Sequence, residues 1–63
     1  MTMTQFLNQL HALDLRPTGR RIGGCEIWRH ADGRPLPIPQ VTFKSPSARM
    51  AASKSIPGWL ERN

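Results

Sequence analysis

An Asp-Gly pair between two short strand-like runs is the feature that most constrains the fold of this chain. Asp32-Gly33 separates the run CEIWRH from the run PLPIP. Such a pair is typical of a tight β-hairpin turn, because glycine adopts positive φ without a steric penalty. Gly23-Gly24 permits a second reversal just before the first run. Residues 20–22 are therefore predicted to form a further short strand, and the middle of the chain an antiparallel sheet.

Alternation along a strand divides the side chains of the first run between two faces. One face carries Cys25, Ile27 and Arg29, and the other carries Glu26, Trp28 and His30. Leu36 and Ile38 pair easily with Ile27 and Cys25, which favours an arrangement with Ile27 toward the helices. Trp28 then stands on the open face of the sheet. In the reversed arrangement Trp28 belongs to the core.

The second run is expected at the edge of the sheet. PLPIP contains three prolines, which cannot donate hydrogen bonds to a strand ladder. The run is therefore predicted as an edge strand or as partly polyproline II. QVTFK, residues 40–44, is expected to extend it after a bend.

The run TMTQFLNQLHALDL, residues 2–15, is predicted to form the first helix. Its large apolar side chains recur at helical spacing and make one stripe, which consists of Phe6, Leu7, Leu10 and Leu13. Thr2 with Gln5 three residues later is typical of a capping box, and Thr4 alone is the alternative N-cap. Pro17 forbids continuation, so we expect the helix to stop near Asp14.

SPSARMAASK is predicted to form the second helix. Ser45 is a good N-cap, and Pro46 suits the first helical position. Met50 and the alanines are expected to face inward. Pro57-Gly58 is expected to break the helix, and the Trp-Leu pair that follows is expected to return to the core as a last helical turn.

The order of these elements predicts an α+β fold, a small α-β-β-β-α domain over residues 1–63. A three-stranded antiparallel sheet with both helices on one face would bury one side of every element. A chain of 63 residues forms one domain at most and buries a modest core. Its single cysteine excludes an internal disulfide, and the spacing of Cys25, His11 and His30 matches no zinc site, so no metal or cofactor is expected. Formation of a homodimer, or docking on a partner, is the remaining aid to stability.

Basic residues outnumber acidic ones by nine to four, which gives a formal net charge of +5. Seven of the nine are arginine, whose planar guanidinium binds phosphate oxygens in pairs and stacks on bases. Five of them fall in the predicted strand region, namely Arg16, Arg20, Arg21, Arg29 and Arg34. Nucleic acid, in particular RNA, is the expected partner, and an acidic protein surface is the alternative.

The sequence also predicts a cytoplasmic protein. No apolar run approaches the roughly 20 residues that span a bilayer. The first ten residues have no basic group before their apolar part, unlike a signal peptide. A single unpaired cysteine fits a reducing compartment.

The hairpin region contains a pattern that starts at Gly23 and, four positions further on, continues with an apolar residue, an aromatic and Arg-His. An Asp-Gly turn and a closing proline follow. The residues are Gly23, Ile27, Trp28, Arg29, His30, Asp32, Gly33 and Pro39. This pattern resembles the signature of the HicA-type mRNA interferase toxins, with Gly24 where serine is usual. With the leading amphipathic helix, the match covers roughly residues 4–40. The resemblance implies a fold similar to a double-stranded-RNA-binding domain, and an antitoxin as a protein partner.

The catalytic position of that family is altered in this chain. Cys25 stands where the family has its catalytic histidine, and Glu26 stands at the second histidine. A general acid or base needs a pKa near the working pH, which imidazole has and a thiol reaches only when perturbed. Cys25 and His30 are the remaining catalytic candidates.

The favoured prediction is a HicA-like, catalytically degenerate domain that binds RNA. The residues expected to bind nucleic acid are Arg20, Arg21, Trp28, Arg29 and Arg34. One alternative is an active toxin-like mRNA endoribonuclease that uses Cys25 or His30. The other is a small phage-type inhibitor that binds an acidic or nucleic-acid-binding protein.

Overall fold

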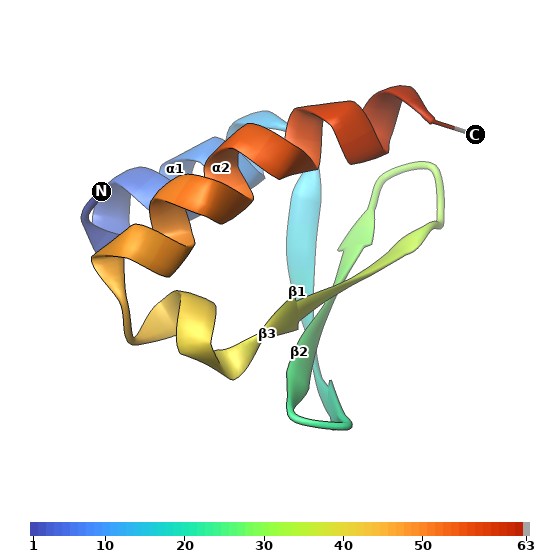
Figure 1. Cartoon of the computed structure of the whole chain (residues 1–63). Coiled ribbons are helices and arrows are strands. Elements are labelled where there is room, and N and C mark those ends of the chain that lie inside the picture. Colours follow the sequence, from blue (N-terminus) through green and yellow to red (C-terminus); the bar gives the residue numbers. More distant parts are fainter. Residues whose placement is uncertain (63) are drawn as a thin grey trace.

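The chain folds into two layers, a pair of helices packed on one face of a small sheet (Figure 1). The computed structural model describes residues 1–62. In chain order its elements are α1 (Met3–Ala12), β1 (Leu15–Ile22), β2 (Cys25–His30), β3 (Pro35–Pro39), the 3-10 helix η1 (Gln40–Phe43) and α2 (Pro46–Glu61). The strands are antiparallel in the order β1-β2-β3, so β1 and β3 are the edges. The predicted α-β-β-β-α class is confirmed.

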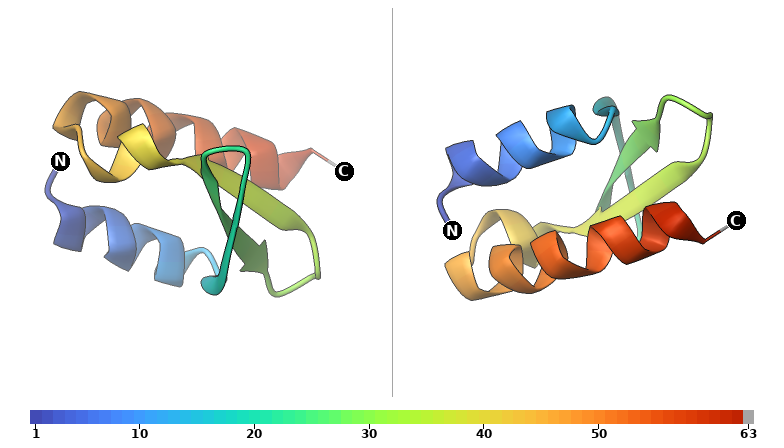
Figure 2. Two further views of the ribbon diagram at one scale, coloured as in Figure 1. Left: turned by 90° about the horizontal axis from the view of Figure 1, so that it is seen from below. Right: turned by 90° about the horizontal axis from the view of Figure 1, so that it is seen from above.

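The start of α1 follows the predicted capping box. The Thr2 hydroxyl accepts the backbone N–H of Gln5, while the Gln5 side chain accepts that of Thr2. The helix ends at Ala12, two residues before the expected position. Asp14, at φ 62°, turns the chain into β1, which begins at Leu15 and is longer than predicted. The two helices then lie side by side over the sheet (Figure 2).

The core lies between the helices and the face of the sheet that carries Trp28, which corrects the favoured prediction for that strand. Trp28 is only 2 % exposed and pairs with Leu36, while Glu26 pairs with Ile38. The buried apolar residues are Phe6, Leu10, Leu15, Trp28, Leu36, Ile38 and Ile56. Burial of the large indole removes an extensive apolar surface from water. Trp28 therefore offers no exposed ring for stacking on a base.

The segment after β3 differs from the expected strand extension. It turns into η1, and the buried Thr42 lies within this turn. Arg49 of α2, 8 % exposed, donates to the carbonyl oxygens of Met1 (3.0 Å) and Thr42 (3.4 Å). These hydrogen bonds satisfy a buried guanidinium and join the N-terminus and η1 to α2.

Helix α2 continues through Pro57-Gly58 to Glu61, where the sequence predicted a break. The proline removes the N–H that would have bonded to the carbonyl of Ser53. The side-chain amide of Gln9 donates to that carbonyl instead, at 2.9 Å. Trp59 packs against the core as part of this longer helix.

The start of α2 agrees with the prediction and its middle does not. Ser45 caps the helix by accepting the N–H of Ala48, and Pro46 occupies the first turn. Met50, expected inside, is 43 % exposed, because Arg49 and Ile56 take the inward positions. Within residues 1–62, neither α-helix combines the length and the apolar character that crossing a bilayer requires.

Candidate nucleic-acid interface

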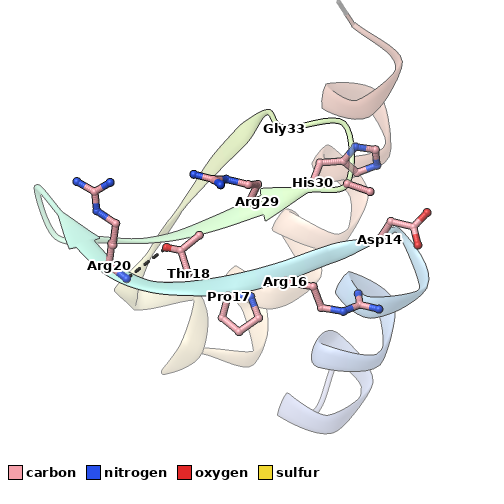
Figure 3. A pocket seen from close by; sticks show the side chains of 9 residues that line it. Asp14, Arg16, Pro17, Thr18, Arg20, Arg29, His30 and Gly33 are labelled. Carbon is pink, nitrogen blue, oxygen red and sulfur yellow. Dashed lines mark hydrogen bonds between the residues drawn. The ribbon is translucent and has the colours of Figure 1, made fainter.

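A shallow open groove of about 860 Å³ runs along β1 and β2 (Figure 3). Its walls come from both strands and from the turns at one end of the sheet. The lining residues are Asp14, Arg16, Pro17, Thr18, Arg20, Arg29, His30, Ala31 and Gly33. Three guanidinium groups and one aspartate carboxylate therefore lie along one concave surface.

Three arginines share the face of the sheet turned away from the helices. Arg16 pairs with Arg29 across the two strands, and Arg20 pairs with Ile27. Cross-strand partners point to the same face, so this basic cluster follows from the register. All three side chains are exposed. We call this surface, made by Arg16, Arg20 and Arg29, the arginine face.

The three side chains differ in how much they are already engaged. Arg16 donates to the carbonyl of His11 (3.2 Å) and to that of Leu15 (2.8 Å), near the end of α1. Within residues 1–62, no salt bridge or side-chain hydrogen bond engages the guanidinium of Arg20 or of Arg29. These two groups are available to an anion from solvent.

Arg34, predicted to bind nucleic acid, lies outside the arginine face and holds the end of α2. Its Nε donates to Asp32 Oδ2 at 2.7 Å, and its Nη atoms donate to three carbonyls, the shortest contact being 2.6 Å to Arg62. The guanidinium also lies 4.8 Å from the centre of the Trp59 ring. Cations are favourable at a helix C-terminus, so these contacts stabilise the fold.

Arg21 also lies apart from the cluster. It pairs with Glu26, so its side chain belongs to the opposite face from Arg20. It sits near the β1–β2 turn, where Gly23 and Gly24 have φ values of 57° and 77°. The reversal predicted at the two glycines is therefore present, but it does not bring Arg21 into the groove.

The two catalytic candidates are not brought together. Cys25 and His30 occupy opposite ends of β2, about 17 Å apart at roughly 3.3 Å per residue, and point to opposite faces. Cys25 has Ile22 and Pro39 as its strand neighbours. His30 Nδ1 lies 3.1 Å from Asp32 Oδ1, inside the β2–β3 turn.

The polar side chain beside His30 is Asp32, and Glu26 has another partner. The Glu26 carboxylate accepts the Trp28 indole N–H at 3.0 Å. Asp32 orients the imidazole instead. The pKa of Asp32 is lowered from 3.8 to about 2, chiefly by the backbone hydrogen bond from Arg34. Desolvation opposes this shift, and the hydrogen bonds from the side chains of Arg34 and His30 add to it.

Sequence reasoning did not select Arg16 and Thr18 as site residues. Arg16 belonged to the arginine-rich region but was not chosen as a binding residue. Thr18 precedes Gly19, and a glycine within a strand pattern signals a bulge. That signal could have extended the strand back to Leu15 and aligned Arg16 with Arg29.

Searches for similar proteins give no further guide to this site. No family model, no characterised protein and no solved structure matches the chain. Within residues 1–62, no three His, Cys, Asp or Glu side chains gather where they could hold a metal ion. What this groove could bind therefore has to be inferred from the residues that line it.

Proposed function

We propose that this chain is a small nucleic-acid-binding domain that holds the RNA backbone on its arginine face without cutting it. The observation that carries the proposal is the pairing of Arg16 with Arg29, with Arg20 beside them on the same face. Like charges directly opposite each other on a sheet destabilise it. A polyanion laid along the groove would replace this repulsion with attraction.

The chemistry of the arginine face favours phosphate over an apolar or uncharged ligand. Guanidinium groups form paired hydrogen bonds with phosphate oxygens. The aromatic side chains Phe6 and Trp28 are buried, and Phe43 and Trp59 pack against the core. Within residues 1–62 no phenylalanine or tryptophan ring lies on the arginine face, so binding would rest on the backbone rather than on bases stacked on such rings.

The resemblance to HicA-type toxins is consistent with this proposal. It also gives a reason to expect binding without cleavage. The family has a histidine at the position of Cys25. Here that position has apolar strand neighbours, and His30 lies at the far end of the same strand. A surface that holds RNA without cutting it is the expected result of losing the catalytic histidine.

Fluorescence anisotropy with a labelled RNA duplex tests the proposal. The variant Arg20→Ala/Arg29→Ala is compared with Lys44→Ala/Lys54→Ala, which removes the same charge from the helical layer. The arginine variant should bind more than about tenfold more weakly. The slope of log K against log salt concentration should become less steep by about 2, because each lost phosphate contact reduces it by about 1. The lysine variant should retain wild-type binding.

Three results would contradict the proposal. Absence of binding at about 50 mM salt would favour the acidic-protein partner. Equal losses in the two variants would mean that net charge, and not the arginine face, attracts RNA. Cleavage of the same RNA that disappears in Cys25→Ala or His30→Ala would establish the toxin-like ribonuclease instead.

A further inference from the structure

Strand β1 contains a bulge in the middle of the arginine face. Pro17 pairs with Trp28 and Arg20 pairs with the next residue on β2, Ile27, so Thr18 and Gly19 are two extra residues on β1. Gly19 has φ 80°, a left-handed conformation that favours glycine. Bulges often re-aim a side chain near a functional site.

The bulge changes which residue lies beside Arg29. With an unbroken register from Arg16, Arg20 would lie opposite Cys25, about 13 Å along β2 from Arg29. The two extra residues bring it opposite Ile27. Arg20 and Arg29 thereby become diagonal neighbours, with Cα atoms about 7–8 Å apart. Figure 3 shows both side chains rising from the same side of the strands.

The hydroxyl of Thr18 holds the bulge together. Its Oγ1 donates to the carbonyl of Ile27 on β2 at 2.6 Å and accepts the backbone N–H of Arg20 at 3.3 Å. One side chain thus links the strand that carries Arg29 to the backbone of Arg20. A half-buried threonine in this position fixes the direction in which Arg20 leaves the sheet.

We infer that Arg20 and Arg29 form one subsite for a phosphodiester backbone, and that Thr18 is the positioning residue that assembles it. The inference rests on the proposed function and names the residues on which binding of the phosphodiester backbone depends. Two guanidinium groups at this separation can each contact a different phosphate of one nucleic-acid strand. A mononucleotide, with its phosphates at one end, would engage fewer of these donors.

A double-mutant cycle with the labelled RNA duplex tests the role of Thr18. Thr18→Val keeps the side-chain shape but loses the hydroxyl, and Thr18→Ser keeps the hydroxyl. Thr18→Val and Arg20→Ala should each weaken binding by about tenfold and lower the salt slope by about 1. The double variant should bind no more weakly than Arg20→Ala, because Thr18 acts through Arg20. Thr18→Ser should restore binding.

Glycine variants provide a second route that does not depend on the hydroxyl. Gly19→Ala should weaken RNA binding, because alanine disfavours φ 80°, although its methyl group would meet no atom within 4 Å. Gly19→Asn should bind better than Gly19→Ala, since asparagine tolerates this conformation. Gly23→Ala is the matched control: Gly23 also has a positive φ and open space around its Cα, but it lies in the β1–β2 turn, so this variant should bind like wild type.

The possible outcomes separate the two proposals. If wild type binds RNA and Thr18→Val binds equally well with the same salt slope, the subsite is wrong while the proposed function stands. The subsite proposal would also be overturned if the losses of affinity from Thr18→Val and Arg20→Ala multiply in the double variant. Equal losses from Gly19→Ala and Gly23→Ala would overturn it as well. If wild type binds no RNA, both proposals fail. A competing mononucleotide that displaces the duplex at equal phosphate concentration would contradict the two-phosphate grip.

Discussion

At the scale of single residues, the arginines of this chain divide into structural and available groups. Arg34 holds the end of α2, and Arg49 is buried among backbone carbonyls. Arg20 and Arg29 have no such contacts within residues 1–62. The sequence showed that five of the seven arginines fall in the strand region. It could not separate the structural arginines from the available ones, because their partners are distant in sequence. Arg34 binds carbonyls at least 25 residues away, and Arg49 binds that of Met1, 48 residues away.

The turn around Asp32 leads to a prediction about acid stability. A carboxyl whose pKa falls from 3.8 to about 2 on folding contributes stability above its unfolded value. That contribution is lost as the pH falls through about 2. Asp32→Asn should therefore lower the Tm at pH 7, and the difference from wild type should shrink between about pH 4 and pH 2.

Thermal unfolding followed by circular dichroism at several pH values measures this difference. Asp14→Asn is the control, since Asp14 forms no salt bridge within residues 1–62. It should change the Tm less at pH 7. A Tm difference for Asp32→Asn that is equally large at pH 2 and pH 7 would contradict the assignment to ionised Asp32.

At the scale of elements, local signals predicted the starts and turns and failed where distant contacts decide. The capping box at Thr2, the N-cap at Ser45 and the β2–β3 turn depend on residues within a few positions, and all three were predicted. Which face of β2 is buried was not predicted correctly, because Ile27 and Trp28 are both apolar and point to opposite faces. Only the helices and β3 settle which side is buried.

The passage of α2 through Pro57 shows the same dependence on a distant contact. A proline within a helix costs about 3 kcal/mol relative to alanine, partly because it leaves a carbonyl without a donor. Gln9, 44 residues away from Ser53 in sequence, supplies that donor. Packing of Trp59 against the core also favours the longer helix.

A second prediction concerns this substitute hydrogen bond. Gln9→Ala should destabilise wild type by about 1–2 kcal/mol, since it leaves the Ser53 carbonyl without its donor. In a Pro57→Ala background the backbone N–H of residue 57 bonds to that carbonyl, so the same change should cost about 1 kcal/mol less. Urea unfolding of the four proteins gives the coupling. An equal cost of Gln9→Ala in both backgrounds would show that Gln9 does not compensate for Pro57.

At the scale of the whole molecule, the sheet presents one face to the helices and one to solvent. Trp28, Leu36 and Ile38 lie on the side of the sheet that packs against the helices. The arginine face lies on the other side. The layout of two helices over a three-stranded sheet was predictable, because it buries one side of each element. The groove was not, since it depends on a bulge that shifts the register by two residues.

The free edge of β3 gives the last prediction. The ladder to β2 needs N–H donors, which Leu36 and Ile38 supply because the prolines have none. The outward edge therefore carries proline carbonyls without donors, which hinders pairing with another strand. Pro37→Val introduces an outward N–H and a residue that favours strands. This variant should self-associate more strongly than wild type in sedimentation experiments, whereas Pro46→Val in α2 should not. Unchanged association of Pro37→Val would mean that some other feature protects this edge.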